Sequence, residues 1–185
     1  TANASKIDIH LEWNDGDPFV AILDNGDAMN DETLSKNVIL GSRNLHEERD
    51  KNDLGRFGLG LKTASFSQCR QLTVESSKSG KATSMTWDLD LVREKNAWIV
   101  KKNYIDDRQV GTKIIWKKID RTKLEINSVY TNFILNNISE HLSLVFHRFI
   151  DGFSSFQKKI NIYINGNLLV SYNPFNENNI ATIKS

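Results

Sequence analysis

Apolar and polar residues alternate along much of this 185-residue chain, and the alternation predicts a fold rich in β-strands. Ile7, Ile9 and Leu11 alternate with polar residues, as expected of a strand that is buried on one face. The continuous apolar run at 19–23 is typical of a central strand that is buried on both faces. Further strands are predicted around residues 70–77, 82–90, 96–103 and 111–116, with the alternation of the second continuing through Leu89 and Leu91.

Other stretches of the chain carry helical or turn signals. Asn30 can cap a helix that follows it, and a second helix is expected between a glycine-rich turn and about Gln68. Residues 121–150 are predicted to be helical, because their apolar residues recur at steps of three and four. An Asn-Gly pair at 165–166 separates two strand-like stretches, so residues 159–170 are predicted to form a hairpin.

These elements together predict a single domain that spans residues 1–185. The expected fold class is α/β of the α+β type: a two-layer sandwich in which helices cover one face of a mixed, mostly antiparallel sheet. Residues 41–54 are highly charged and nearly free of apolar side chains, which indicates a mobile loop or lid. Residues 121–185 are interpreted as a helical and hairpin extension of the same domain.

Composition narrows the possible partners. The net charge is +1, so no global field recruits nucleic acid or an anionic membrane, and no direct nucleic-acid partner is expected. No apolar run approaches the ~20 residues that a membrane-spanning helix needs. The single cysteine, Cys69, follows an apolar helix face and is predicted to be a core thiol in a reducing, cytoplasmic setting. The four histidines lack metal-ligand spacing, so no metal ligand is assigned.

A glycine-rich turn is the first candidate for chemistry. Gly55, Gly58 and Gly60 lead directly into the predicted helix that carries Lys62. Glycine allows the backbone to approach a ligand closely, and a helix that begins there directs free N–H groups at it. The pattern favours a phosphate site with Lys62 as a point charge, although a turn that serves only packing would look the same.

Two common phosphate motifs do not fit this turn. A P-loop requires lysine directly after its last glycine, where this chain has Leu61. The dinucleotide-binding fingerprint requires a third glycine at the position of Thr63. A nucleotide bound here would therefore be held by a different architecture.

Asp24 is the second candidate, because it is a carboxylate at the end of an apolar strand. Its burial costs free energy unless a donor reaches it. The exocyclic amine of adenine is one such donor, and Gly26 would let a flat base lie against the backbone. The alternative is that Asp24 only caps the turn at Asn25 and Gly26.

The order of these motifs resembles that of the GHKL ATPase superfamily, which includes DNA gyrase B subunits, large heat-shock chaperones, sensor histidine kinases and MutL. Residues 24–29 look like the family's adenine motif, although Ala28 replaces a second glycine, and 55–62 look like its second glycine box. Gly111-Thr112 looks like the late threonine motif. The resemblance covers roughly residues 1–117 and implies the Bergerat ATP-binding fold. A lysine two places after the last glycine of the box is closest in style to MORC-type ATPases.

The resemblance implies a role for each matching residue. Asp24 would accept the adenine amine with support from Thr112, Gly26 would let the base approach, and Met29 would pack against the ring. At the other end, the glycine box would donate backbone N–H groups to the phosphates and Lys62 would reach the terminal phosphate. The box residues concerned are Gly55, Gly58, Leu59 and Gly60.

The implied function is ATP hydrolysis that acts as a conformational switch, with Mg²⁺ as cofactor, ATP and ADP as ligands, and a nucleotide-dependent homodimer. Residues 41–54 would be the lid. The family's first motif supplies a glutamate that orients water and an asparagine that holds Mg²⁺, and both are expected upstream of Thr1, as if the chain were truncated. Two alternatives remain: a histidine kinase catalytic domain, favoured by residues 58–61, and a nucleotide-sensing module that does not hydrolyse ATP, favoured by the missing motif and Ala28. No protein client is indicated.

Overall fold

The computed structural model describes residues 3–38, 60–78, 80–106, 110–119, 128–152 and 159–175. Most of the glycine box and the predicted lid, residues 41–54, lie outside these ranges. The predictions for Gly55, Gly58 and Leu59 therefore lie outside the described residues as well.

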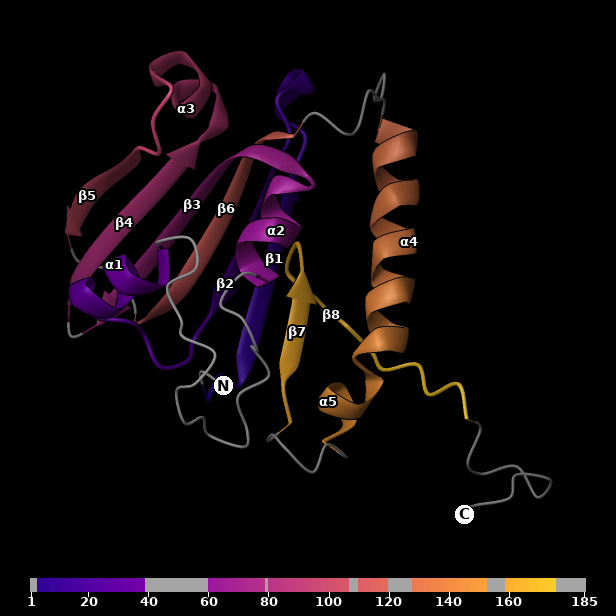
Figure 1. Cartoon of the computed structure of the whole chain (residues 1–185). Coiled ribbons are helices and arrows are strands. Elements are labelled where there is room, and N and C mark those ends of the chain that lie inside the picture. Colours follow the sequence, from indigo (N-terminus) through magenta and orange to yellow (C-terminus); the bar gives the residue numbers. More distant parts are fainter. Residues whose placement is uncertain are drawn as a thin grey trace.

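The described strands form one sheet. They are β1 (Lys6–Glu12), β2 (Phe19–Asp24), β3 (Cys69–Lys78), β4 (Lys81–Asp88), β5 (Val100–Asp106), β6 (Gly111–Ile119), β7 (Asn161–Ile164) and β8 (Asn167–Leu168). Within the described ranges their order is β5-β4-β3-β6-β2-β1-β7-β8 (Figure 1). Only the β1–β7 pair among them is parallel, so the prediction of a mixed, mostly antiparallel sheet is confirmed.

The helices are short, apart from one. They are α1 (Asp31–Val38), α2 (Gly60–Phe66), α3 (Leu89–Lys95), α4 (Ser128–Val145) and α5 (His147–Asp151), with a 3-10 turn at Asn14–Gly16. α1 packs against β4 and α2 packs against β3, and Figure 1 shows α4 beside β7. No helix in the described ranges is long and apolar enough to cross a membrane.

Two apolar clusters attach the helices to one face of the sheet. Strand register places Ile9, Ile22, Ile114, Val74 and Met85 in a single row across five strands. Side chains in one row share a face. The row runs from one cluster to the other, so both groups of helices cover the same face, as predicted.

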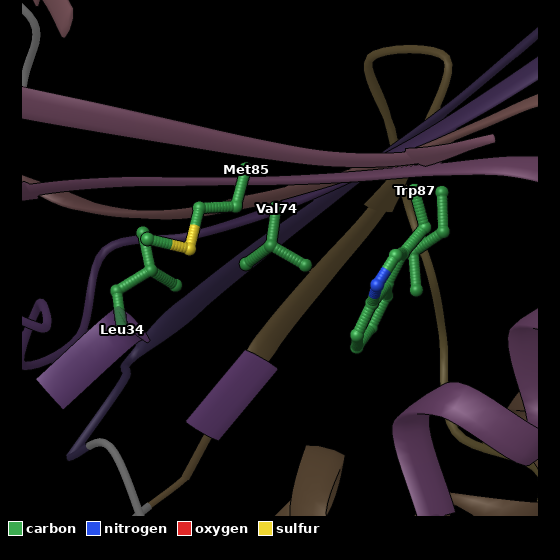
Figure 2. Packing of buried hydrophobic residues seen from close by; sticks show 5 residues of the cluster. Leu34, Val74, Met85 and Trp87 are labelled. Atoms are coloured by element: carbon green, nitrogen blue, oxygen red, sulfur yellow. The ribbon is translucent and has the colours of Figure 1, made fainter. Parts of the chain in front are cut away.

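The first cluster lies beneath α1 and α2. Its buried members are Leu34, Leu72, Val74, Met85 and Trp87. Figure 2 shows Val74, Met85 and Trp87 projecting from the same side of the sheet, with Leu34 rising from α1 to meet them.

The second cluster lies beneath α4 and α5, and its buried members are Ile150, Ile160, Ile162, Ile164 and Leu169. Leu135, Ile138 and Leu142 of α4 pack against it, as do the apolar residues of β1. The described part of the C-terminal segment therefore covers the sheet and also extends it.

Local signals located several elements correctly. Asn30 Oδ1 accepts the Thr33 N–H at 2.8 Å, which is the predicted helix cap. Asn165 and Gly166 have φ values of 46° and 82°, as a two-residue hairpin turn requires. The Asn165 amide also bonds both backbone groups of Leu11, which fixes the hairpin to β1. Cys69 is 1% exposed, so its assignment to the core is confirmed.

The strand predicted at 82–90 is wrong at its end. β4 stops at Asp88, and both Leu89 and Leu91 belong to α3. The physical reason is a cap: Asp88 Oδ1 accepts the Asp90 N–H at 3.1 Å, which favours a helix start. Lys118 reinforces this corner, because its ammonium binds both Asp88 and Asp90 at 2.8 Å.

Candidate functional site

A row of polar side chains crosses the covered face at the ends of four neighbouring strands. Register pairs Asp24 of β2 with Thr112 of β6, Thr112 with Ser76 of β3, and Ser76 with Thr83 of β4. This polar row lies two residues along from the apolar row and shares its face. Ser76 and Thr83 are buried, whereas Asp24 and Thr112 are half-buried. The two sequence-predicted adenine residues, Asp24 and Thr112, are thus brought side by side.

The Asp24 carboxylate combines burial with spare hydrogen-bonding capacity. Its Oδ1 accepts the Gly26 N–H at 2.9 Å, so the turn cap considered from the sequence is present. Desolvation raises the pKa of Asp24, and the backbone N–H groups of Gly26 and Thr112 oppose that rise. A carboxylate offers about four lone-pair sites, so two backbone donors leave room for a further donor. Capping and ligand binding are therefore compatible.

Gly111 explains why Thr112 lies beside Asp24. Its φ of 141° falls in a region that residues with side chains rarely adopt. A Cβ at this position would lie 2.0 Å from the carbonyl oxygen of Asp24. Only glycine allows β6 to begin this close to the end of β2. The Gly-Thr pair was found from the sequence, but this steric reason was not.

Ser76 was missed by the sequence analysis. It is 2% exposed, and its Oγ accepts the Met29 N–H at 2.8 Å. The same oxygen lies 3.4 Å from Thr112 Oγ1. A serine in a strand is usually taken to face solvent, yet Ser76 keeps the two-residue step of Leu72 and Val74 and therefore faces inward. This two-residue spacing from Leu72 and Val74 could have identified Ser76 from the sequence.

The loop between β2 and α1 is packed closely against the sheet. Gly26 is buried and Ala28 is 7% exposed, so the methyl group that replaces the family's second glycine is accommodated. Met29 packs against the first apolar cluster, and its sulfur accepts a hydrogen bond from Asn37 at 3.3 Å. Contact between Met29 and a base stays a prediction.

Lys62 lies inside the protein and not at its surface. It belongs to α2, which begins at Gly60, and it is 2% exposed. Its ammonium lies 5.6 Å from the centre of the Trp87 ring. Desolvation lowers the pKa of Lys62. Its predicted role at the terminal phosphate stays a prediction, as does that of Gly60.

A family model described as "Histidine kinase-, DNA gyrase B-, and HSP90-like ATPase" matches residues 1–139 of the 185. The chain belongs to this ATPase family. The matched range contains every residue of the polar row and Lys62, and the eight-stranded sheet of the described residues agrees with the family's ATP-binding fold. The comparison with curated proteins found no match.

Two hollows in the described part of this GHKL-type domain can be compared with the predicted nucleotide site. One, of about 190 Å³, involves Asp24 and Thr112 but is also lined by Asp8, Glu75 and Lys113. Those three residues occupy the alternate positions of their strands, so this hollow lies toward the opposite face of the sheet. The other, of about 1080 Å³, lies between α4 and residues 164–172 and contains none of the predicted site residues.

Members of the GHKL family bind ATP, usually together with Mg²⁺. In the described ranges, no group of three or more histidine, cysteine, aspartate or glutamate residues could hold a metal ion. The described residues thus contain no such metal cluster, and the adenine contacts of Asp24 and Thr112 stay predictions.

Proposed function

We propose that this chain binds ATP with its adenine ring against the polar row, and that binding drives lid closure and dimerisation. The observation that carries the proposal is the half-buried Asp24 carboxylate, fixed beside Thr112 by the close approach of Gly111. A carboxylate kept in a desolvated position is costly, and a ligand that donates to it offsets that cost.

At the adenine end, Asp24 accepts the exocyclic amine and Thr112 bonds the adjacent ring nitrogen. Gly26 lacks a side chain that would obstruct the base, and Met29 packs against the ring. These contacts orient the nucleotide so that its phosphates point toward the glycine box. They do not depend on a metal ion.

At the phosphate end, Gly58 and Gly60 donate backbone N–H groups and Lys62 neutralises the terminal phosphate. Lys62 occupies a desolvated position against Trp87, so a phosphate that reaches it gains a strong charge-assisted hydrogen bond. The lysine side chain has enough rotatable bonds to move its ammonium from the ring to the phosphate.

Turnover needs positioning and charge neutralisation more than covalent chemistry. Mg²⁺ would add charge neutralisation at the phosphates. A glutamate of the family's first motif would orient the attacking water. Closure of residues 41–54 over the terminal phosphate would exclude water and favour association of two copies.

The switch is tested by sedimentation of the protein with ADP and with a non-hydrolysable ATP analogue, together with an assay of phosphate release with ATP. We expect dimers with the analogue and monomers with ADP, because only the terminal phosphate holds the lid. Equal association with both ligands would contradict the switch. Nucleotide-dependent dimers without phosphate release would favour the sensing module over the ATPase.

A further inference from the structure

Ser76 occupies a junction between both sides of the candidate adenine site. Its hydroxyl oxygen accepts the N–H of Met29, on the loop after β2, and contacts the hydroxyl of Thr112 on β6. Because Ser76 is 2% exposed, its own proton cannot be given to bulk water. Within the described residues, the acceptor nearest to the Ser76 hydroxyl is Thr112 Oγ1, whose oxygen lies 3.4 Å away.

This arrangement decides the direction of the bond between the two hydroxyls. If Thr112 donated to Ser76, the Ser76 proton would be buried without an acceptor, which costs free energy. If Ser76 donates to Thr112, its proton is satisfied and the Thr112 proton is directed toward the half-buried side of the row. The second arrangement leaves no buried donor unpaired. The separation of 3.4 Å is long for two hydroxyls, so the bond orients the Thr112 proton weakly.

We propose that Ser76 is a positioning residue that biases the Thr112 hydroxyl toward acting as a hydrogen-bond donor and thereby strengthens a preference for adenine over guanine. The proposal rests on the proposed nucleotide site. Ser76 does not touch the base, and it acts through Thr112. Its bond to the Met29 N–H also holds the loop between β2 and α1 against the sheet, next to Thr112.

The chemistry of the two purines explains the preference. Adenine presents an amine donor next to a ring-nitrogen acceptor, which matches Asp24 as acceptor beside Thr112 as donor. Guanine presents a carbonyl acceptor next to a ring N–H donor, so Asp24 would face an acceptor and Thr112 would face a donor. A site that leaves polar groups unpaired rejects the wrong ligand strongly. If Thr112 could rotate freely, half of this mismatch would disappear.

The test measures the affinities of ATP and GTP for the wild-type chain and for Ser76→Ala by calorimetry. We expect Ser76→Ala to weaken ATP binding by about five- to tenfold and GTP binding by less than roughly twofold, so that the ratio of the two affinities falls. Ser77→Ala is the matched control, because Ser77 is the neighbouring serine, is 3% exposed and points to the other face of the sheet. It should leave the ratio unchanged.

A second comparison separates positioning from a merely structural effect. In a Thr112→Val background the hydroxyl that Ser76 orients is gone, so adding Ser76→Ala should not change the ATP-to-GTP ratio further. Ser76→Cys keeps the branching of the side chain and replaces oxygen by the somewhat larger sulfur, a weaker donor and acceptor, so it should lower the ratio by less. It also serves if Ser76→Ala does not fold.

The outcomes distinguish this proposal from the proposed function. Wild-type protein that is folded and binds neither nucleotide would overturn both. Wild-type protein that prefers ATP, with variants at Ser76 that weaken ATP and GTP equally or leave both unchanged, would overturn the positioning role alone. An equal drop in the ratio with and without the Thr112 hydroxyl would also contradict it.

Discussion

At Asp24, burial and hydrogen bonding act on the carboxyl group in opposite directions. Burial raises the pKa of its carboxyl group, whereas two backbone N–H groups favour the ionised form. A carboxyl whose pKa is raised in the folded state favours folding when it is protonated. Its contribution to stability is therefore present at low pH and is lost as the pH rises through the folded-state pKa. The charge that would bind adenine is thus retained at a cost to stability.

The resulting prediction concerns the free energy of unfolding. In urea denaturation at a series of pH values, Asp24→Asn should gain stability relative to wild type as the pH rises above the ordinary aspartate value of 3.8. The difference should become constant once the wild-type carboxyl is fully ionised. Asp17→Asn, at an exposed position, is the control. A difference that does not change with pH would show that Asp24 is not desolvated as described.

Lys62 gives a prediction that separates the two ends of the nucleotide. Lys62→Met should weaken ATP binding by about tenfold or more and ADP binding much less, because only ATP carries the phosphate that Lys62 is proposed to reach. Competition binding with both nucleotides measures the two affinities. Lys36→Met, which removes an exposed lysine of α1, is the control and should change neither. Equal losses of affinity for ATP and ADP would show that Lys62 does not contact the terminal phosphate.

Some site residues could be predicted from the sequence, because their residue type is unusual at that point in the pattern. Asp24 ends an apolar run, and Gly111 precedes a β-branched strand, so both attract attention without any structure. Ser76 does not, because a serine in a strand is ordinary and its partners, Met29 and Thr112, are distant in sequence. The buried position of Lys62 was also not predictable, because it depends on how α2 lies over Trp87.

At the scale of elements, the start of β6 against the end of β2 fixes the site. Gly111→Ala should destabilise the protein by roughly 3 kcal/mol or more, because its Cβ would overlap backbone that cannot yield. Gly80→Ala is the matched control: Gly80 also has positive φ, but nothing lies within 4 Å of its Cβ position. It should cost only about 1 kcal/mol. Chemical denaturation of both variants measures the difference.

Equal costs for the two glycine variants would contradict the steric account of this junction. Loss of nucleotide binding by Gly111→Ala under conditions in which it is still folded would agree with it, because Asp24 and Thr112 would be pushed apart.

Elements with local signals were predictable, and elements set by distant pairing were not. The cap at Asn30 and the turn at 165–166 are each determined by two to four consecutive residues. The end of β4 was predicted wrongly, because the alternation of apolar and polar residues continues past Asp88 and does not reveal that Asp88 caps a helix. The parallel pairing of β1 with β7 joins residues more than 150 positions apart, and no local pattern carries it.

In the whole molecule, the polar row forms the boundary of the covered face. Apolar clusters beneath α1–α2 and beneath α4–α5 hold the helices on the same side of the sheet, and the polar row that contains Asp24 runs beside the apolar row, two residues along the same strands. A nucleotide bound there would lie beside packed helices and next to the chain that leads to α2. The fold class and family followed from the order of the motifs, whereas this placement required the strand register.

The central claim is that this chain binds adenine nucleotides through Asp24. Calorimetric titration of the wild-type chain and of Asp24→Asn with ATP and ADP tests it most directly. The account predicts binding by wild type and an affinity at least about tenfold lower for a variant that remains folded, because the acceptor for the adenine amine is lost. A folded wild-type chain that binds neither nucleotide, or an Asp24→Asn variant that binds as tightly as wild type, would contradict it.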